Sequence, residues 1–118
     1  LTEPLELTLY WQAIGPIAED YTVFVHLLTP EGEFVLGQDG QPLDGLYPTS
    51  FWGEGELVVD GRYLDSAQHK PWLVDLPPGE YQLQVGFYLL ATGQRLPVSG
   101  PLSELGDRVR LQTIEIVP

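Results

Sequence analysis

Apolar and polar residues alternate with a period of two along several segments of this chain. The clearest case is the segment 80–88, which directly follows a Pro-Pro-Gly turn. One face of that segment carries Tyr81, Leu83, Val85 and Phe87. The other face carries Glu80, Gln82 and Gln84. Only a β-strand with one buried face has this period, so the pattern predicts a strand whose start is set by the turn.

Similar segments recur along the chain. Residues 5–11 alternate in the same way, and residues 21–28 are apolar on both faces, which predicts a strand at the centre of its sheet. Further short strands are expected at 34–36, 56–60 (ended by Gly61), 72–76, 95–98 and 108–117. The last of these changes phase between Leu111 and Ile114, which predicts a β-bulge near Gln112-Thr113.

The pattern predicts an all-β fold in a single domain, residues 1–118. No window shows the apolar stripe of an amphipathic helix, and turn signals separate the strands about every 8–12 residues. These features favour a two-sheet antiparallel β-sandwich, with Ig-like or jelly-roll topology. The expected core is Leu7, Leu9, Trp11, Val23, Val25, Leu83, Val85 and Phe87.

The segment 37–55 is rich in turn residues and has no strand period, so we expect a long loop there. It carries three aromatic residues, Tyr47, Phe51 and Trp52, among small polar residues. Exposed rings beside polar side chains would form a platform for a sugar, with Asp39 and Asp44 as polar contacts. Alternatively, the loop folds down and its aromatic rings cap the open end of the sheets. Both interpretations stay open at this point.

The charge balance narrows the range of partners. The chain has 17 acidic and 5 basic residues, a formal net charge of -12. Such a field repels nucleic acid and anionic lipid headgroups, so neither is an expected partner. Cysteine is absent, which excludes disulfides and thiolate chemistry. No apolar run approaches the roughly 20 residues of a spanning helix, so direct membrane insertion of this chain is not expected.

Catalytic motifs are not found in the sequence. The serines lack a nucleophile-elbow context, and the two histidines, His26 and His69, show no spacing that suggests a shared site. We expect His26 to be a buried histidine with a backbone or carboxylate partner rather than a base or a metal ligand. The glycine-flanked Asp39 and Asp44 do not match a calcium loop. Arg62 and Arg95 are expected to pair with nearby carboxylates. No catalytic residue, metal or cofactor is therefore predicted.

Several short phrases follow one another along the chain. They are Leu9-Tyr10-Trp11-Gln12, Asp20 to Leu27, Pro48-Thr49 with Trp52, Gly55-Glu56 with Asp60, Pro78-Gly79 with Tyr81, Gly86 with Tyr88, and Gly93 to Pro97. In this order they resemble the soluble β-sandwich domain at the C-terminal end of some bacterial multi-span membrane proteins. Those proteins are similar to dolichyl-phosphate-mannose–protein mannosyltransferases. The resemblance spans nearly the whole chain and supplies no catalytic residue.

The resemblance implies a non-catalytic, extracytoplasmic accessory or interaction domain, excised from a membrane glycosyltransferase-like protein. Its expected partner is the membrane-embedded portion of the same polypeptide, on the extracytoplasmic side of a bacterial membrane. The alternative is a carbohydrate-binding module that holds a sugar ligand on Tyr47, Phe51 and Trp52, with Asp39 and Asp44 nearby. In neither case is this chain expected to be an enzyme.

Overall fold

The computed structural model describes residues 5–64, 77–98, 106 and 108–116. Within these ranges the chain forms β-strands and two short 3-10 helices, and no α-helix. The strands are β1 (Leu5–Gln12), β2 (Thr22–Leu28), β3 (Phe34–Gly40), β4 (Leu57–Leu64), β5 (Gly79–Tyr88) and β6 (Val109–Ile116). The 3-10 helices η1 (Pro42–Gly45) and η2 (Thr49–Phe51) lie between β3 and β4. The fold is therefore mostly β, as the alternation predicts.

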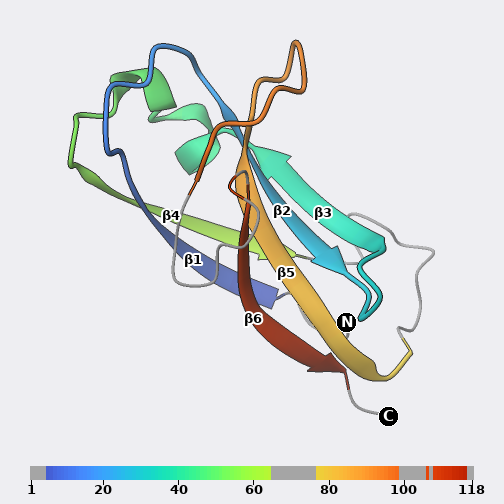
Figure 1. Cartoon of the computed structure of the whole chain (residues 1–118). Helices are drawn as coiled ribbons and strands as arrows, with labels where there is room; N and C mark the ends of the chain where they lie inside the picture. The colour runs from blue at the N-terminus through green and yellow to red at the C-terminus, as the bar shows by residue number, and fades with distance from the viewer. Residues whose placement is uncertain (1–4, 65–76, 99–105, 107, 117–118) are drawn as a thin grey trace.

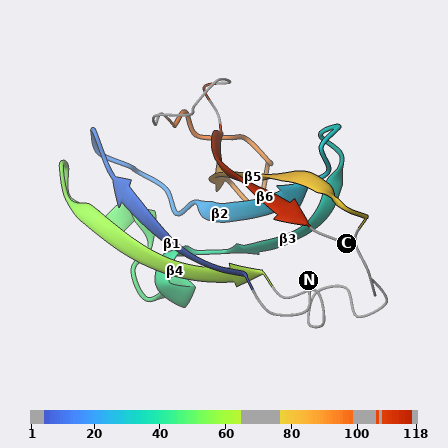
Figure 2. The same cartoon turned by 90° about the horizontal axis from the view of Figure 1, so that it is seen from below.

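The strands form two antiparallel sheets. One is a two-stranded ribbon of β1 and β4, and the other has the order β3-β2-β5-β6. Figure 1 shows the two sheets, and Figure 2 shows the ribbon lying below β2, β5 and β6. The strand with two apolar faces, β2, lies between β3 and β5, so its predicted central position is confirmed.

One hydrophobic core lies between the two sheets. The ribbon contributes Leu9, Val58 and Leu64, and the larger sheet contributes Val23, Val25, Leu27, Leu36, Tyr81, Leu83, Val85 and Phe87. Trp11 reaches across, with its ring centroid 4.4 Å from that of Phe87. Of the predicted core residues, Leu7 and Trp11 are partly buried and pack against the core, while the others are buried. The predicted core is thus largely confirmed.

Two expected boundaries are wrong. Strand β3 continues to Gly40, into the segment expected to be a loop, and β4 continues through Gly61 to Leu64. In β3, the polar Gln38 pairs with Val25 of β2 on the inward face and bonds to a buried arginine, so no apolar alternation marks the strand. Gly61 pairs with Thr8 and is exposed, where a missing side chain removes no core contact.

The C-terminal bulge is confirmed. Gln82 of β5 pairs with Thr113, whereas Gln84 pairs with Arg110, so two residues of β6 face one residue of β5. The segment 95–98 forms a single bridge, between Arg95 and Tyr88, rather than a strand. The strand expected at 72–76 lies outside the described residues.

Truncation of the core should destabilise the protein strongly. Leu83 is fully buried between the sheets, so Leu83→Ala should lower the free energy of unfolding by about 2–4 kcal/mol through lost burial and a cavity. Urea denaturation followed by tryptophan fluorescence measures this change. The control is Val59→Ala, because Val59 is 47% exposed on the ribbon. Equal effects of the two substitutions would contradict the position of the core.

Candidate functional site

Residues 41–56, which include most of the loop expected at 37–55, fold down onto the connection between β1 and β2. Thr49 is fully buried at the join. Its hydroxyl donates to the carbonyl of Glu19 at 2.6 Å and accepts from the N–H of Tyr21 at 3.0 Å. The N–H of Ser50 donates to the carboxylate of Asp20 at 3.1 Å. We call this folded segment the cap.

Trp52 points into the core rather than toward solvent. Its side chain is only 6% exposed, and its ring lies edge-on to Phe87 with the centroids 5.9 Å apart. The indole N–H donates to the carbonyl of Tyr47 at 3.0 Å, which satisfies the polar atom inside the fold. Because a sugar needs an exposed ring face, Trp52 cannot serve as a stacking surface in this conformation.

The hydroxyl of Tyr47 is also engaged within the cap. It donates to both carboxylate oxygens of Glu56, at 2.8 and 2.9 Å. The N–H of Gly53 donates to the same carboxylate at 2.8 Å. The hydrogen bond from Gly53 lowers the pKa of Glu56 most, and the bond from Tyr47 lowers it further. The bond to Glu56 in turn raises the pKa of Tyr47. Of the three aromatic residues in the suggested platform, only Phe51 remains largely exposed.

The two aspartates suggested as polar contacts lie on different parts of the fold. Asp39 is on the outer face of β3, where the hydroxyl of Tyr88 donates to it at 2.9 Å. Asp44 is exposed in η1, in the cap. The structure therefore does not unite the five suggested residues around one ligand. Among the described residues, no group of three or more histidine and carboxylate side chains is placed to hold a metal ion.

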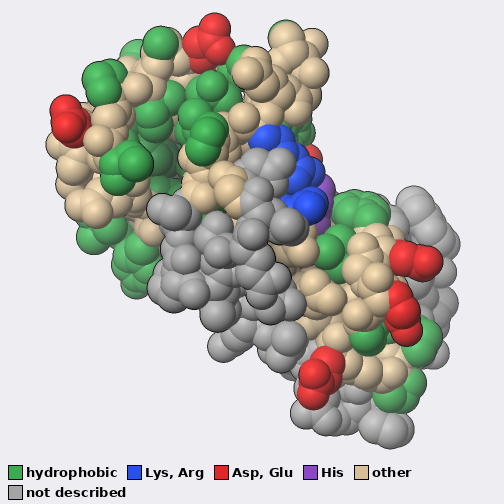
Figure 3. All heavy atoms as spheres, viewed as in Figure 1, with side chains coloured by type: hydrophobic (Ala, Val, Ile, Leu, Met, Phe, Trp, Pro, Cys, Tyr) green, Lys and Arg blue, Asp and Glu red, His purple; other side chains and the backbone are tan. Residues whose placement is uncertain are grey.

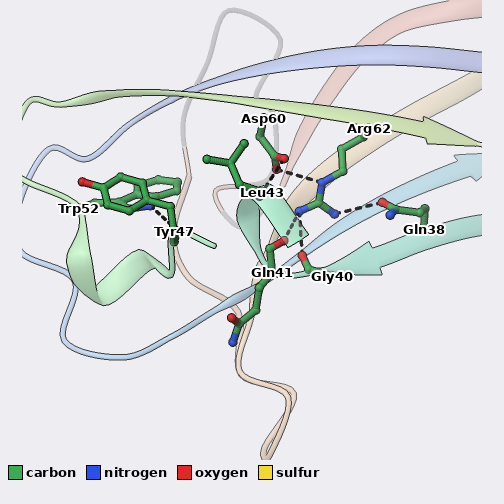
Figure 4. A network of polar contacts seen from close by, with 8 residues as sticks. All are labelled: Gln38, Gly40, Gln41, Leu43, Tyr47, Trp52, Asp60 and Arg62. Carbon is green, nitrogen blue, oxygen red and sulfur yellow. Dashed lines mark hydrogen bonds and ion pairs between the residues drawn. The ribbon is translucent and has the colours of Figure 1, made fainter. Parts of the chain in front are cut away.

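A buried ion pair joins the ribbon to the larger sheet (Figure 4). Asp60 and Arg62 lie on the inward face of β4 and are 1% and 6% exposed. The Arg62 Nε–H donates to Asp60 at 2.9 Å, and Nη1 donates to the Gln38 side chain at 3.0 Å. Nη2 donates to the carbonyls of Gly40 and Gln41 at 2.8 and 3.0 Å. The expected pairing of Arg62 with a carboxylate is confirmed, but its burial was not expected.

The same ion pair holds an unusual turn. Asp60 accepts a hydrogen bond from the N–H of Leu43 at 3.2 Å. Leu43 and Asp44 both have left-handed backbone conformations, with φ of 53° and 55°. Residues other than glycine rarely adopt this backbone conformation, because it brings Cβ too close to the following carbonyl oxygen. The strand alternation of Val58, Asp60, Arg62 and Leu64 was the available sequence signal for this network, because it places the charged pair on the buried face of β4.

Several strongly exposed apolar side chains belong to the cap and to the strand ends next to it. Figure 3 shows hydrophobic surface at the end of the molecule that carries η1, η2 and the turn into β4. We use the name apolar lobe for five exposed side chains of the segments at this end, Tyr10, Ile14, Leu46, Phe51 and Leu57. These side chains are 59–90% exposed. A main-chain hydrogen bond joins two segments of the lobe: the N–H of Gly55 donates to the carbonyl of Ala13 at 2.7 Å.

The charged residues in the segments that form the apolar lobe are all acidic. Residues 10–20 and 42–57 contain Glu19, Asp20, Asp44, Glu54 and Glu56, and no lysine or arginine. All but Glu56 are exposed. The lobe therefore combines apolar side chains with carboxylates that have no cation from the same segments beside them.

No protein-family model, no curated protein and no solved structure matches this chain. Within the described residues, no helix has the length and apolar character needed to cross a membrane.

Breaking the buried ion pair should destabilise the fold. Arg62→Leu leaves Asp60 charged and buried without its partner, so the free energy of unfolding should fall by about 3–5 kcal/mol. The double variant Asp60→Leu/Arg62→Leu removes both charges and should recover part of that loss. Urea denaturation of the wild type and of each variant measures the coupling. A loss of less than about 1 kcal/mol in Arg62→Leu would show that Asp60 is not held as described.

The left-handed turn makes a second stability prediction. Asp44→Gly should raise the free energy of unfolding by about 0.5–1 kcal/mol. Glycine removes the energetic cost of the left-handed conformation, and its larger conformational entropy in the unfolded chain offsets only part of this gain. Gly45 has φ 83°, so Gly45→Ala should lower the same quantity by about 1–2 kcal/mol. Thermal unfolding followed by circular dichroism measures both. A destabilised Asp44→Gly would indicate that the Asp44 side chain stabilises the turn.

Proposed function

We propose that this chain is a β-sandwich domain that has no catalytic activity of its own and serves as an interaction domain. The two antiparallel sheets that share one core support the sandwich architecture. The proposed context is the one that the sequence resemblance implies: an extracytoplasmic accessory domain of a bacterial membrane protein similar to glycosyltransferases. The partner in that context is the membrane-embedded portion of the same polypeptide.

The observation that carries the proposal is the apolar lobe. Large apolar side chains such as Ile14, Leu46 and Phe51 are exposed to water. A partner that covers them removes apolar surface from water, which favours binding. The surrounding carboxylates favour a partner segment that carries lysine or arginine beside its apolar residues. We therefore propose that the lobe binds a cationic amphipathic segment of the partner.

The alternative of a carbohydrate-binding loop has less support. That alternative depends on the rings of Tyr47, Phe51 and Trp52 acting together as a platform. In the cap, the Trp52 ring is buried and the Tyr47 hydroxyl is bonded to Glu56. Because only Phe51 of these three rings is largely exposed, the three-ring platform is not formed, and the lobe is better suited to the apolar side of a cationic amphipathic segment.

A model peptide tests the lobe directly. The probe is a synthetic amphipathic peptide of leucine and lysine, with a leucine–glutamate peptide of the same pattern as control. We expect saturable binding of the lysine peptide, affinity that falls as salt rises, and no binding of the glutamate peptide. Amide NMR shifts should change in the cap and at the start of β4.

Matched variants separate the lobe from general attraction to an acidic protein. Leu46→Ser/Phe51→Ser should weaken binding of the lysine peptide about tenfold or more, through lost apolar contact. The control is Leu90→Ser, because Leu90 is 77% exposed but lies in the turn after β5. If the lobe variant and the control bind the peptide equally well, the lobe is not the contact surface.

Two further observations bear on the wider proposal. A run of spanning helices in the gene upstream of the codon for Leu1 would support the membrane context, and a different neighbouring domain would contradict it. Turnover of glycosides or esters by the purified protein, lost on substitution of one acidic residue, would contradict the absence of catalysis.

A further inference from the structure

A second cluster of polar and aromatic side chains lies on the outer face of the four-stranded sheet, which faces away from the core. We call it the outer-face cluster and define it by Phe24, His26, Phe34, Asp39, Tyr88 and Arg95. The register brings these residues together, because Phe24 pairs with Asp39 on β3 and Thr22 pairs with Tyr88 on β5. In Figure 3, histidine and arginine surfaces meet near the middle of the molecule.

Asp39 is held in one orientation at this cluster. The Tyr88 hydroxyl donates to Oδ2 at 2.9 Å, and the Nε2 atom of His26 lies 3.5 Å from Oδ1. Burial raises the pKa of Asp39, but the hydrogen bonds from His26 and Tyr88 and the charges of His26 and Arg62 outweigh it, so the pKa lies below its ordinary value. The side chain is 36% exposed. A carboxylate accepts about four hydrogen bonds, so Asp39 keeps acceptor capacity toward solvent.

The rings of the cluster are packed in fixed positions. The His26 ring lies 4.7 Å from Phe24 and 5.0 Å from Phe34 between centroids, edge-on to the latter. Gly37 makes this possible, because a Cβ there would come within 2.8 Å of His26 and 3.2 Å of Phe34. Phe34 is nevertheless 54% exposed. It therefore presents an apolar ring surface in the same cluster as the carboxylate of Asp39, with His26 in contact with both.

Arg95 balances the charge of the cluster. Its guanidinium lies 4.5 Å from the centre of the Phe24 ring, and a backbone bridge to Tyr88 fixes its segment. The cluster thus contains one carboxylate, Asp39, whose residue pairs with Phe24 in the sheet, and one guanidinium, Arg95, over the Phe24 ring. This local balance contrasts with the overall net charge of -12 and gives no preference for an anion or a cation.

We propose that the outer-face cluster is a shallow binding site for a neutral polyhydroxylated ligand, a sugar residue of a glycan. A sugar presents an apolar C–H face that would pack on Phe34, and hydroxyl groups that would donate to Asp39. A preorganised acceptor and ring need little reordering on binding, which favours affinity. A flat sheet face buries little of a small ligand, so the dissociation constant should be millimolar. The site is separate from the apolar lobe.

Titration of the protein with cellotriose, maltotriose and mannotriose tests the proposal. At sugar concentrations up to about 20 mM, at least one trisaccharide should shift amide NMR signals of β2, β3 and β5 in a saturable way. Asp39→Asn removes the charged acceptor and Phe34→Ala removes the ring, and each should weaken that binding about tenfold or more. The control Tyr63→Ala alters an exposed ring on β4, outside both proposed surfaces, and should leave the affinity unchanged.

The outcomes distinguish a binding site from a purely structural cluster. A dispersed NMR spectrum shows whether Asp39→Asn and Phe34→Ala are folded. Tyr88→Phe is a milder variant, because it removes the hydrogen bond to Asp39 and leaves the carboxylate in place. Binding by the wild type that Asp39→Asn and Phe34→Ala both weaken supports the site. The absence of saturable shifts with all three sugars, or binding that neither variant alters, or shifts confined to the lobe, would overturn it.

Discussion

The pairing of Arg62 with Asp60 is the interaction on which the arrangement of the two sheets depends. The strand β4 belongs to the ribbon, yet Arg62 donates to Gln38, Gly40 and Gln41, which lie at the end of β3 and just beyond it in the larger sheet. Buried charges without partners are strongly unfavourable, so the pair fixes the relative position of groups from both sheets. Apolar packing alone is not directional in this way.

The cap depends on the same pair. Asp60 accepts the N–H of Leu43 and so holds the left-handed turn from which the rest of the cap continues. Further along, Thr49 fastens the cap to the segment before β2, and Trp52 closes the core against Phe87. A segment without strand period thus becomes a fixed layer, because several of its polar groups bond to one another or to a neighbouring segment.

The two proposed surfaces have different physical characters, which follow from where the basic residues stand. The apolar lobe is built from segments without lysine or arginine, so its field is negative and its apolar side chains are exposed. The outer-face cluster includes the guanidinium of Arg95, which lies over the Phe24 ring, as well as the carboxylate of Asp39. One surface therefore favours a cationic protein segment, and the other favours a neutral ligand.

The sequence by itself determined the strand class, the central position of β2, most of the core and the bulge in β6, because each follows from the two-residue period of nearby side chains. The tertiary structure decided how 37–55 divides into a strand and a cap, that Trp52 is buried, and that Asp39 meets His26 and Tyr88 rather than Asp44. Those outcomes depend on pairing between strands far apart in the chain. Local periodicity carries no information about which distant group satisfies a buried charge or covers a ring.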